Sequence, residues 1–472
     1  MSVLTNVILR NIQEIEEKEI NKVSKEIYRQ KFHIMPPVGW LNDPNGLCYF
    51  KGEYHVFFQY CPFDANGGLK VWGHYTSKNL IEWEYKGVSF VPDCPYDCHG
   101  VYSGSAYVEN DKMHIFYTGN VKYDGDFDYI NNGRGAYTIK SESVDGINFS
   151  YKKCLMSLDD MPKDYTCHIR DPKVYKENDE YLMVIGGRKK ENRGAVLLYS
   201  SDNLENWTLK KEIMSDKHFG YMWECPDVLK FGDKKFLSMS PQGLKREEYR
   251  FQNVYQSGYA LIENDIINTE NFREWDYGFD FYAPQTFTDE KGRTILIGWV
   301  GVPDSENEYT NPTTKRGWQH NLTLLRELKY KNDKILQYPV SEFNVLRKDF
   351  EEIQSGETKT FKNRCFDCEI KDIYGKININ ICDSVNFDYD NGVAILSLTE
   401  KAGYGRKVRK AKIDNIYNLR VIADVSVIEI YVNDGEYVFT TRFYTEINEY
   451  YLDVNTNANS ISTWELNSMK GI

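Results

Sequence analysis

The sequence has no long apolar run and no surplus of basic residues, and each absence excludes one class of binding partner. No stretch of its 472 residues approaches the roughly 18 consecutive apolar residues that cross a membrane. Lys and Arg number 58 against 70 Asp and Glu, a net charge of −12, so the clustered cations that bind nucleic-acid phosphates are lacking. We therefore expect neither a membrane nor a nucleic acid as partner.

The N-terminus lacks the basic segment and apolar core of a signal peptide, so we expect a cytoplasmic protein. Residues 2–30 are typical of a charged helix, with Ile12, Ile15, Ile20 and Val23 spaced among Glu and Lys. Two positions stay open for this helix: against its own chain, or against a second copy in a homo-oligomer.

Closely spaced cysteines are few. Only Cys94 with Cys98, and Cys365 with Cys368, lie within four residues of each other. Neither pair has a second pair or histidines at the spacing of a zinc site. We expect no metal site, and we expect the ten cysteines to stay reduced, as is usual in the cytoplasm.

What the chain does contain is aromatic, β-prone sequence, including 36 Tyr and 24 Phe. From Phe32 onward, short apolar runs alternate with Gly, Asn, Asp and Pro turns, which predicts an all-β chain. The clearest strand-like runs are residues 54–60, 113–117, 181–185, 235–239 and 294–299.

Marked corners recur along this β region at intervals of roughly 53 to 68 residues. They are Asn42-Asp43-Pro44, Ser103-Gly104-Ser105, Arg170-Asp171-Pro172, Glu224-Cys225-Pro226 and Ala283-Pro284-Gln285. Five corners with about four strand-like runs each predict a five-bladed β-propeller, whose innermost strands bring the corners to one central pocket. A β-sandwich with accidental spacing stays open as the alternative.

The sequence pattern changes after Val340. Residues 393–398 and 427–432 alternate as short strands, and the turn 433–436 starts a hairpin, which favours a separate β-sandwich with a docking or stabilising role. The sequence thus predicts four parts: an N-terminal helical extension (1–31), the five-bladed β-propeller (32–340), a linker (341–349) and a C-terminal β-sandwich (350–472).

Three of the corners carry an acid next to proline or one residue away: Asp43, Asp171 and Glu224. Two carboxyl groups flanking a scissile bond are the working parts of a glycoside hydrolase. One attacks carbon and stays ionised, whereas the other starts protonated and needs a raised pKa. Crowding of acids in one pocket raises a pKa, because a second negative charge is disfavoured.

The neighbours of these acids suggest how their charges are divided. Trp223 precedes Glu224 and is expected to desolvate it, while the Asn42 amide is placed to hydrogen-bond Asp43 and keep it ionised. Arg170 is expected to hold a nearby carboxylate in its charged form.

Sugar sites also use aromatic faces and planar polar groups. Taken singly, each such residue is more often structural, since Trp is highly buried on average. The candidates are the indoles Trp40, Trp72, Trp223 and Trp299, the amides Gln59 and Gln285, and the hydroxyls Ser103 and Ser105.

Four of these motifs together resemble glycoside hydrolase family 32, the invertase and fructan-hydrolase family. They are Trp40-Leu-Asn-Asp-Pro-Asn-Gly46, Tyr102-Ser-Gly-Ser-Ala106, Arg170-Asp-Pro172 and Glu224-Cys-Pro226, in the family's order. Three further stretches are most similar to the family's intracellular bacterial sucrose-6-phosphate hydrolases: residues 221–226, 240–243 and 278–286.

The resemblance implies a retaining mechanism without a metal or another cofactor, acting on a small sugar, sucrose or sucrose 6-phosphate. It implies that Asp43 is the nucleophile, Glu224 the acid/base and Asp171 the transition-state stabiliser. The residues it offers as substrate contacts are Trp40, Leu41, Asn42, Gln59, Trp72, Tyr102, Ser103, Arg170 and Trp299.

Two alternatives stay open. A fructan hydrolase or fructosyltransferase shares the acids and differs at the pocket rim, and a propeller that only binds sugar or protein shares the fold alone. A 6-phosphate on the substrate requires cations near the pocket mouth. The candidates from sequence are Lys70, Lys245, Arg246, Lys315 and Arg316, whose commonest role is as solvated loop charges.

Overall fold

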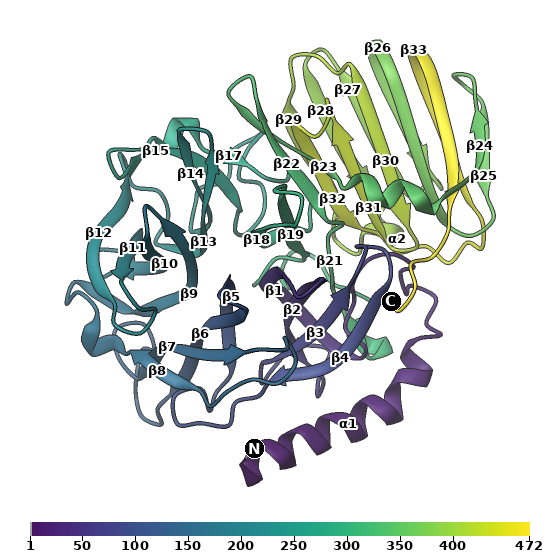
Figure 1. Ribbon diagram of the computed structural model, residues 1–472. Helices are drawn as coiled ribbons and strands as arrows, with labels where there is room; N and C mark the ends of the chain where they lie inside the picture. The colour runs from purple at the N-terminus through teal and green to yellow at the C-terminus, as the bar shows by residue number, and fades with distance from the viewer. Residues whose placement is uncertain (1) are drawn as a thin grey trace.

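The computed structural model describes residues 2–472, and most of them lie in β-strands. Figure 1 shows sheets arranged around a common centre, with a broader group of long strands beside them and a helix across the base. The predicted all-β class is confirmed, and so are the five strand-like runs, which lie in β2, β6, β10, β14 and β19.

Residues 39–339 fold into successive antiparallel sheets, in which most strands pair with the next strand along the chain. The first holds β1 (Gly39–Phe50), β2 (Glu53–Cys61), β3 (Val71–Ser77) and β4 (Trp83–Phe90), with β20 (Trp318–Gln319) parallel to β1. The second holds β5 (Val101–Glu109), β6 (Lys112–Lys122), β7 (Arg134–Ser143) and β8 (Lys153–Met156).

A nine-stranded sheet follows, in which two antiparallel runs are joined by one short strand. The first run holds β9 (Tyr165–Glu177), β10 (Glu180–Lys189), β11 (Arg193–Ser201) and β12 (Thr208–Ser215). The second holds β13 (Met222–Phe231), β14 (Lys234–Gln242), β15 (Gly258–Glu263) and β17 (Arg273–Glu274). The joining strand β16 (Ile266–Ile267) pairs with both β12 and β15.

The last sheet within residues 39–339 holds β18 (Tyr282–Thr288), β19 (Thr294–Val300), β21 (Asn321–Leu322), β22 (Arg326–Lys331) and β23 (Lys334–Pro339). The innermost strands β1, β5, β9, β13 and β18 contact one another in that order, and β18 returns to contact β1. This closed ring of a β-propeller excludes the β-sandwich alternative for residues 39–339.

The recurrent Ser/Asn/Asp stretches of the sequence form one kind of double turn. A serine hydroxyl accepts two backbone N–H groups, and an Asn or Asp oxygen two residues later accepts the next two. The pairs are Ser77 with Asn79, Ser143 with Asp145, and Ser201 with Asn203, which link β3–β4, β7–β8 and β11–β12.

A 3₁₀ turn (Ser341–Leu346) leads from the propeller sheets into the C-terminal strands. These are β24 (Arg347–Glu352), β25 (Thr358–Phe361), β26 (Cys365–Ile381), β27 (Val385–Asp390), β28 (Val393–Leu398), β29 (Val408–Lys412), β30 (Asn418–Asp424), β31 (Val427–Val432), β32 (Tyr437–Arg442) and β33 (Tyr450–Leu466). A short helix α2 (Glu400–Gly403) follows β28.

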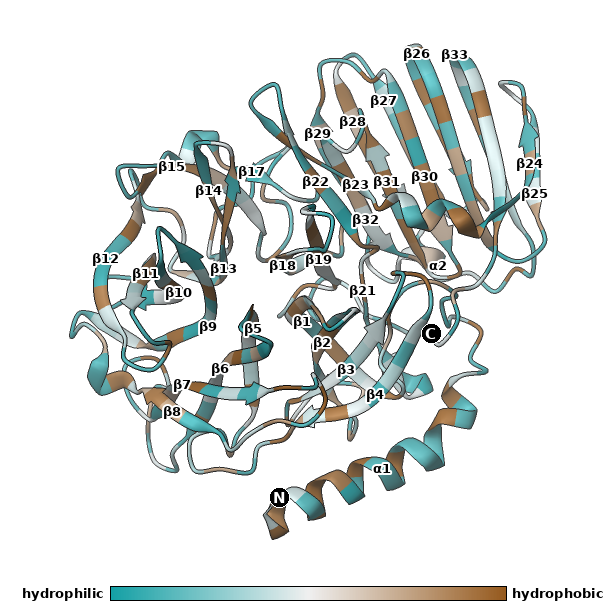
Figure 2. Cartoon of the chain, in the orientation of Figure 1, coloured by the Kyte–Doolittle hydropathy of each residue, from teal (hydrophilic) through white to brown (hydrophobic). Residues whose placement is uncertain are grey.

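Strand β26 divides the C-terminal strands into two layers. One of its edges pairs with β33 over most of its length, whereas its other edge pairs first with β30 and then with β27. The β27–β29 and β30–β32 groups therefore diverge and enclose one apolar core between them, as in a β-sandwich. Apolar and polar residues alternate along β27 (Figure 2), and along β28, whose residues are mostly apolar, half-buried and buried positions alternate, as this packing requires.

Helix α1 (Val3–Val23) packs against its own chain, which is the first of the two packing arrangements left open by the sequence. Ser2 caps the helix by accepting the N–H of Thr5, and Ile12 is buried. Glu16 accepts hydrogen bonds from Tyr60 at 2.9 Å and from Tyr85 at 2.7 Å. Within residues 2–472, no helix is long and apolar enough to cross a membrane.

Candidate active site

Each of the five inner strands is interrupted by a β-bulge at its predicted corner. The pairing register shifts between Leu41 and Pro44 in β1, between Val101 and Gly104 in β5, and between Glu224 and Asp227 in β13. Comparable shifts interrupt the pairing of β9 with β10 and of β18 with β19. Since a bulge re-aims the side chains at its position, the corner residues can turn toward the axis.

Three corners also hold a non-glycine residue at positive φ directly before proline. Asp171 has φ 67°, Cys225 has φ 47° and Ala283 has φ 48°. Residues other than glycine are uncommon in the left-handed region, Cys and Ala more so than Asp, and a following proline restricts the backbone further. Such strain persists where the surrounding structure fixes it, and it is common at functional sites.

Asp43 lies among donors from two strands. Ser103 Oγ donates to its Oδ2 at 2.5 Å, and Asn42 Nδ2 donates to its Oδ1 at 3.1 Å. The Asn42 amide also donates to Gln59 Oε1, and its own Oδ1 accepts from the Trp40 indole at 3.0 Å. The contact predicted between Asn42 and Asp43 is thus confirmed, and Gln59 and Trp40 join the same network.

Asp171 is linked to Asp43 through Cys225. The Cys225 backbone N–H donates to Asp171 Oδ2 at 2.9 Å. The Cys225 thiol lies 3.6 Å from this oxygen and 3.7 Å from Asp43 Oδ2. Because Cys225 follows Glu224 directly, all three acids meet in one cluster although they come from three different strands.

Glu224 is held by three side chains. Arg170 donates to its Oε1 through Nε at 2.8 Å and Nη2 at 2.6 Å. Gln242 and Tyr282 donate to its Oε2 at 2.7 and 2.6 Å. Arg170 therefore pairs with Glu224, 54 residues away, and not with its neighbour Asp171.

Burial and mutual repulsion shift the proton affinities within this cluster. Burial raises the pKa of Asp171 to about 7; the Arg170 charge opposes the shift, and the Glu224 and Asp43 charges add to it. Burial also raises the pKa of Asp43, against the hydrogen bonds from Ser103 and Asn42. The expectation that crowding protonates Glu224 stays a prediction.

Three residues expected at the site have side chains in the core. Trp223 has no exposed surface and donates to Phe219 O at 2.7 Å, so it faces away from Glu224. Successive side chains of a strand point to opposite faces, which corrects its expected role. Trp72 and Leu41 are likewise fully buried and cannot touch a sugar with their side chains.

Trp72 supports the site from behind instead, since its indole donates to Tyr102 O at 3.2 Å. The other serine and glutamine candidates also brace the inner strands. Ser105 Oγ donates to Pro172 O at 2.8 Å, and Gln285 Nε2 donates to Gly104 O at 3.0 Å.

Trp40 and Trp299 form an aromatic wall beside the acids. Their ring centroids are 6.0 Å apart, and the His320 ring contacts both, at 4.3 Å from Trp40 and 5.0 Å from Trp299. Lys70 Nζ lies 4.7 Å from the Trp40 ring centroid. The half-buried Trp40 is the member of this wall that is open to a ligand.

Sequence reasoning missed the partners that complete the cluster: Thr118, His168, Cys225, Gln242 and Tyr282. Thr118 Oγ1 accepts the Asp171 N–H at 2.9 Å, and His168 Nδ1 lies 2.9 Å from Arg170 Nη1. Thr118 and His168 lie in no stretch singled out from the sequence, and each acts on a residue of β9. Cys225 lies inside the Glu224-Cys-Pro226 corner, and Gln242 and Tyr282 lie within the stretches 240–243 and 278–286, so a sequence signal could have identified these three.

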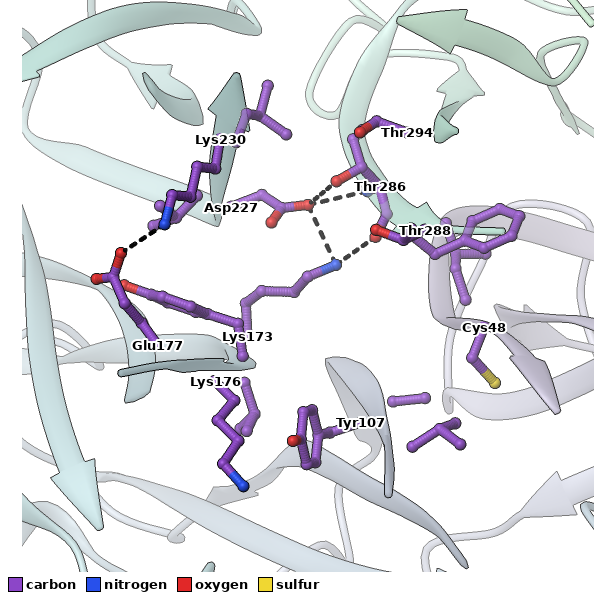
Figure 3. A pocket seen from close by; sticks show the side chains of 18 of the residues that line it. Cys48, Tyr107, Lys173, Lys176, Glu177, Asp227, Lys230, Thr286, Thr288 and Thr294 are labelled. Atoms are coloured by element: carbon purple, nitrogen blue, oxygen red, sulfur yellow. Dashed lines mark hydrogen bonds and ion pairs between the residues drawn. The ribbon is translucent and has the colours of Figure 1, made fainter. Parts of the chain in front are cut away.

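A separate cavity of about 480 Å³ lies toward the other ends of the same inner strands. Its lining follows the corners in sequence, as with Lys173 after Asp171 and Thr286 after Ala283. Figure 3 shows Lys173 contacting Asp227, with a salt bridge of 3.1 Å, and Thr286. In the described part of the chain, no group of three potential ligands is arranged to hold a metal ion.

Comparison with known proteins places the chain among enzymes. Residues 33–339 match the family model of the glycosyl hydrolases family 32 N-terminal domain, and residues 378–468 match that of the family's C-terminal domain. Sucrose-6-phosphate hydrolase of Bacillus subtilis (strain 168) is 38% identical over 455 residues, covering 92% of both chains. The Staphylococcus xylosus enzyme of the same name is 36% identical over 467 residues, again covering 92% of both chains.

Solved structures agree with these matches. A sucrose-6-phosphate hydrolase from Lactobacillus gasseri superposes with a TM-score of 0.87 at 27% identity, covering 97% of both chains. A mutant GH32 β-fructofuranosidase from Bombyx mori, in complex with sucrose, gives a TM-score of 0.84 at 29% identity, covering 98% of this chain and 99% of that one.

Proposed function

The chain belongs to glycosyl hydrolase family 32, and from this premise we propose that it is a retaining β-fructofuranosidase. Its substrate is sucrose or sucrose 6-phosphate, cleaved at the fructosyl linkage. The relatives named sucrose-6-phosphate hydrolases support this substrate, and so does the Bombyx mori complex with sucrose. The observation that carries the proposal is the convergence of Asp43, Asp171 and Glu224 in one hydrogen-bonded cluster.

In the first step, a carboxylate oxygen of Asp43 attacks the anomeric carbon of the fructosyl unit. Glu224 gives its proton to the glycosidic oxygen, and the carbon–oxygen bond breaks with its electrons on that oxygen. The glucosyl product leaves, and a covalent fructosyl-enzyme remains. Asp171, when ionised, stabilises the positive charge that develops on the fructosyl ring.

In the second step, Glu224 takes a proton from water, whose oxygen attacks the same carbon and releases Asp43. Two inversions at one carbon retain its configuration. Glu224 accepts all four of its hydrogen bonds, which suits the carboxylate form that acts as base. For the acid form, the Tyr282 hydroxyl can rotate its O–H away and accept a hydrogen bond from the protonated Glu224 carboxyl, with both side chains in place.

The sugar contacts are part of this proposal. Asn42, Gln59 and Ser103 surround Asp43, and Arg170 adjoins Glu224. These positions suit hydroxyl recognition around the fructosyl ring, with Trp40 and Trp299 as the aromatic wall and Tyr102 at the rim. Nucleophile, acid/base and stabiliser are all side chains, so the reaction needs neither a metal nor another cofactor.

We also propose five blades for the propeller, with the nine-stranded sheet counted as two. Its two antiparallel runs share only the two-residue strand β16, and each contributes one strand to the inner ring. The four predicted parts (1–31, 32–340, 341–349 and 350–472) stay the proposed domain organisation. A cytoplasmic location and self-association as a homo-oligomer remain predictions.

The three clustered acids favour this enzyme over a propeller that only binds sugar or protein. A fructan hydrolase or fructosyltransferase remains the second candidate within the same chemistry. Comparing the turnover of sucrose, sucrose 6-phosphate and inulin separates these activities, and a preference for inulin would contradict the proposal.

Proton NMR during hydrolysis tests the mechanism. Retention predicts that the β-anomer of fructofuranose appears first and then mutarotates. Initial release of the α-anomer would show inversion and rule out Asp43 as the nucleophile. Retention also predicts that the carboxyl groups of Asp43 and Glu224 stand about 5 to 5.5 Å apart.

A further inference from the structure

One cation stands on the Asp43 side of the acid cluster without a carboxylate bonded to it. Lys70 directly precedes β3, and its Nζ lies 4.7 Å from the Trp40 ring centroid. The Trp40 indole donates to Asn42, which donates to Asp43, so the ammonium group adjoins the network that holds Asp43. Across residues 2–472, no side chain forms an ion pair or a hydrogen bond with Lys70 Nζ.

The surroundings of Lys70 hold its ammonium group in place. Gly67, at φ 97°, brings the backbone so close that a side chain there would lie 3.3 Å from Lys70 Nζ and 3.5 Å from the Trp40 ring. Lys70 O accepts the Val101 N–H at 2.9 Å, which ties this segment to β5. The half-buried ammonium therefore lies between a glycine backbone and an indole face, where its position is fixed.

Lys70 keeps its charge at neutral pH although it is partly removed from water. Burial lowers the pKa of Lys70 to about 8, and the neighbouring Cys61 and Asp43 oppose this shift. The charge acts in return on Asp43, whose pKa it lowers. An ammonium group without a bonded partner is costly to bury, so its place beside a reactive carboxylate calls for a functional explanation.

Asp43 is the acid that needs this positive charge. Burial raises the pKa of Asp43, and the Glu224 charge adds to the shift, whereas hydrogen bonds from Ser103 and Asn42 oppose it. Arg170, the other cation at the site, is bonded to Glu224 at 2.6 Å.

The remaining neighbours on the inner strands do not supply a cation either. Asp171 belongs to the same acid cluster, and its own pKa is raised in part by the Asp43 charge. The Cys225 thiol lies 3.7 Å from Asp43 Oδ2 and is neutral, because burial raises its pKa.

The groups that face Lys70 from other elements offer it no second counterion. Cys61 comes from β2 and carries a thiol. His320, whose ring centroid lies 4.3 Å from that of Trp40, is neutral because burial lowers its pKa well below the usual value. Asp43 is thus the one carboxylate among the groups that act on Lys70.

We propose that Lys70 is a positioning residue of the reaction, which acts through Asp43 by keeping this carboxylate ionised while Glu224 still holds its proton. The inference rests on the proposed function, in which Asp43 attacks the fructosyl carbon. Because Lys70 acts without a hydrogen bond, it leaves the oxygens of Asp43 open to that carbon. When the fructosyl-enzyme is hydrolysed, the same charge favours the departure of Asp43 as a carboxylate.

This role differs from the one that the sequence suggested for Lys70, which was one of five cations considered for a phosphate at the pocket mouth. The structure places its ammonium group on the Asp43 side of the site. Two of the other four are engaged in ion pairs, Arg246 with Glu308 and Arg316 with Glu26 at 2.7 Å.

The test is the pH profile of kcat/KM for the wild type, Lys70→Met and Lys70→Arg, measured with sucrose or sucrose 6-phosphate, whichever the wild type cleaves faster. Comparison of variants on one sugar cancels any titration of the substrate itself. The acidic limb of this profile reports the ionisation of the nucleophile in the free enzyme.

We expect the acidic limb of Lys70→Met to move to higher pH by about 0.5 to 1 unit, because Asp43 loses a favourable charge. At a pH on this limb, kcat/KM relative to its own maximum should therefore fall about 3- to 10-fold. The alkaline limb, which reports loss of the proton from the acid, should move much less. Lys70→Arg keeps the positive charge, and its acidic limb should stay with that of the wild type.

Lys51→Met is the matched control. Lys51 Nζ also lies over an aromatic ring, 5.7 Å from the Phe50 centroid, but it follows β1 at the end opposite to Asp43. Its profile should equal that of the wild type at every pH.

The outcomes separate this inference from the function on which it rests. An unchanged acidic limb in folded Lys70→Met would overturn the role of Lys70 and leave the proposed function standing. An equal loss of kcat/KM at every pH would overturn it too, because that result indicates a substrate contact. If Lys70→Met does not fold, Lys70→Gln provides the same comparison. Cleavage of neither sugar by the wild type would instead overturn the proposed function itself.

Discussion

At the scale of single residues, Asp171 is a carboxylate that the fold holds in the acid cluster at a cost in folding free energy. It sits at positive φ before a proline, it is buried, and its oxygen accepts the Cys225 N–H. Its nearest charges include two other acids, and burial raises its pKa to about 7. The positive φ and the burial of a charge beside two other acids cost folding free energy, which the Cys225 hydrogen bond offsets in part, and together these features hold a carboxylate in the acid cluster.

We predict that Asp171→Asn stabilises the protein at neutral pH and removes its activity. A carboxyl whose pKa rises from about 3.9 in the unfolded chain holds its proton more tightly when folded. Wild-type stability therefore falls as pH rises from about 4 to about 7. At pH 8 the variant should be more stable by on the order of 2 kcal/mol, with kcat lowered about 10³-fold.

Thermal unfolding at pH 5 and at pH 8 measures this directly. The Tm of Asp171→Asn should exceed that of the wild type at pH 8 and approach it at pH 5. A variant less stable than the wild type at pH 8 would show that the buried charge is fully compensated.

The acids were predictable from sequence because each one marks a local corner beside proline. The contacts of their partners were not, since Gln242 reaches Glu224 from the neighbouring strand β14 and Tyr282 reaches it from β18 of another sheet. Trp72 and Trp223 failed as sugar contacts for a related reason. Which face a side chain takes depends on the strand register and its bulges, which the sequence does not reveal.

At the scale of elements, helix α1 closes the first sheet from outside. The apolar side chains of Ile12 and Val23 are buried against the propeller, whereas Ile20 remains 39% exposed. The helix was predicted to reach residue 30, but it ends at Val23, followed by an irregular segment that leads to β1. The C-terminal end of α1 could not be predicted from the charged residues, because Lys and Glu occur both before and after Val23.

We predict that Ile12→Ala destabilises the protein by about 2 to 4 kcal/mol, the usual cost of emptying a buried aliphatic site. Ile20→Ala is the matched control and should cost less than about 1 kcal/mol, because its side chain is partly exposed. Urea unfolding measures both, and kcat should stay unchanged in each. Equal, small losses in the two variants would mean that the helix does not contribute to the fold.

Long strands were the most predictable elements, and strands of two residues were the least predictable. The clearest runs, such as residues 54–60 and 181–185, lie within β2 and β10. Two-residue strands such as β16 and β20 carry no pattern of their own, because long-range pairing alone creates them.

At the scale of the whole molecule, buried charges join the propeller to the sandwich. Arg326 of β22 donates to Glu429 of β31 through Nη2 at 2.7 Å, and His33 contacts both Asp424 at 2.8 Å and Glu429 at 3.0 Å. Asp276 accepts the Thr440 N–H at 2.8 Å across the same boundary. Such a network fixes one relative position of the propeller and the sandwich, since leaving any member unpaired is costly.

We predict that this boundary loosens in alkaline solution through His33. Burial alone would lower the pKa of His33, but the hydrogen bonds with Asp424 and Glu429 raise it to about 9. A raised folded pKa contributes stability fully below about pH 6.5, and this contribution is lost as pH rises through 9. The loss should be on the order of 3 kcal/mol.

The measurement is Tm between pH 6.5 and 9.5 for the wild type, His33→Gln and the exposed control His99→Gln. At pH 6.5 the Tm of His33→Gln should be lower than that of the wild type, and it should fall less as pH rises to 9.5. The Tm of His99→Gln should follow that of the wild type at every pH. Parallel curves for all three proteins would contradict the role of His33.

The account depends most on Asp43 as the group that attacks the fructosyl carbon, because the other assignments follow from its position. The most direct measurement is the hydrolysis of sucrose and sucrose 6-phosphate by Asp43→Ala, with its fold checked by circular dichroism and Tm. We expect a folded protein whose kcat is lowered at least about 10⁴-fold for both sugars. Hydrolysis at the wild-type rate by the folded variant would contradict the account.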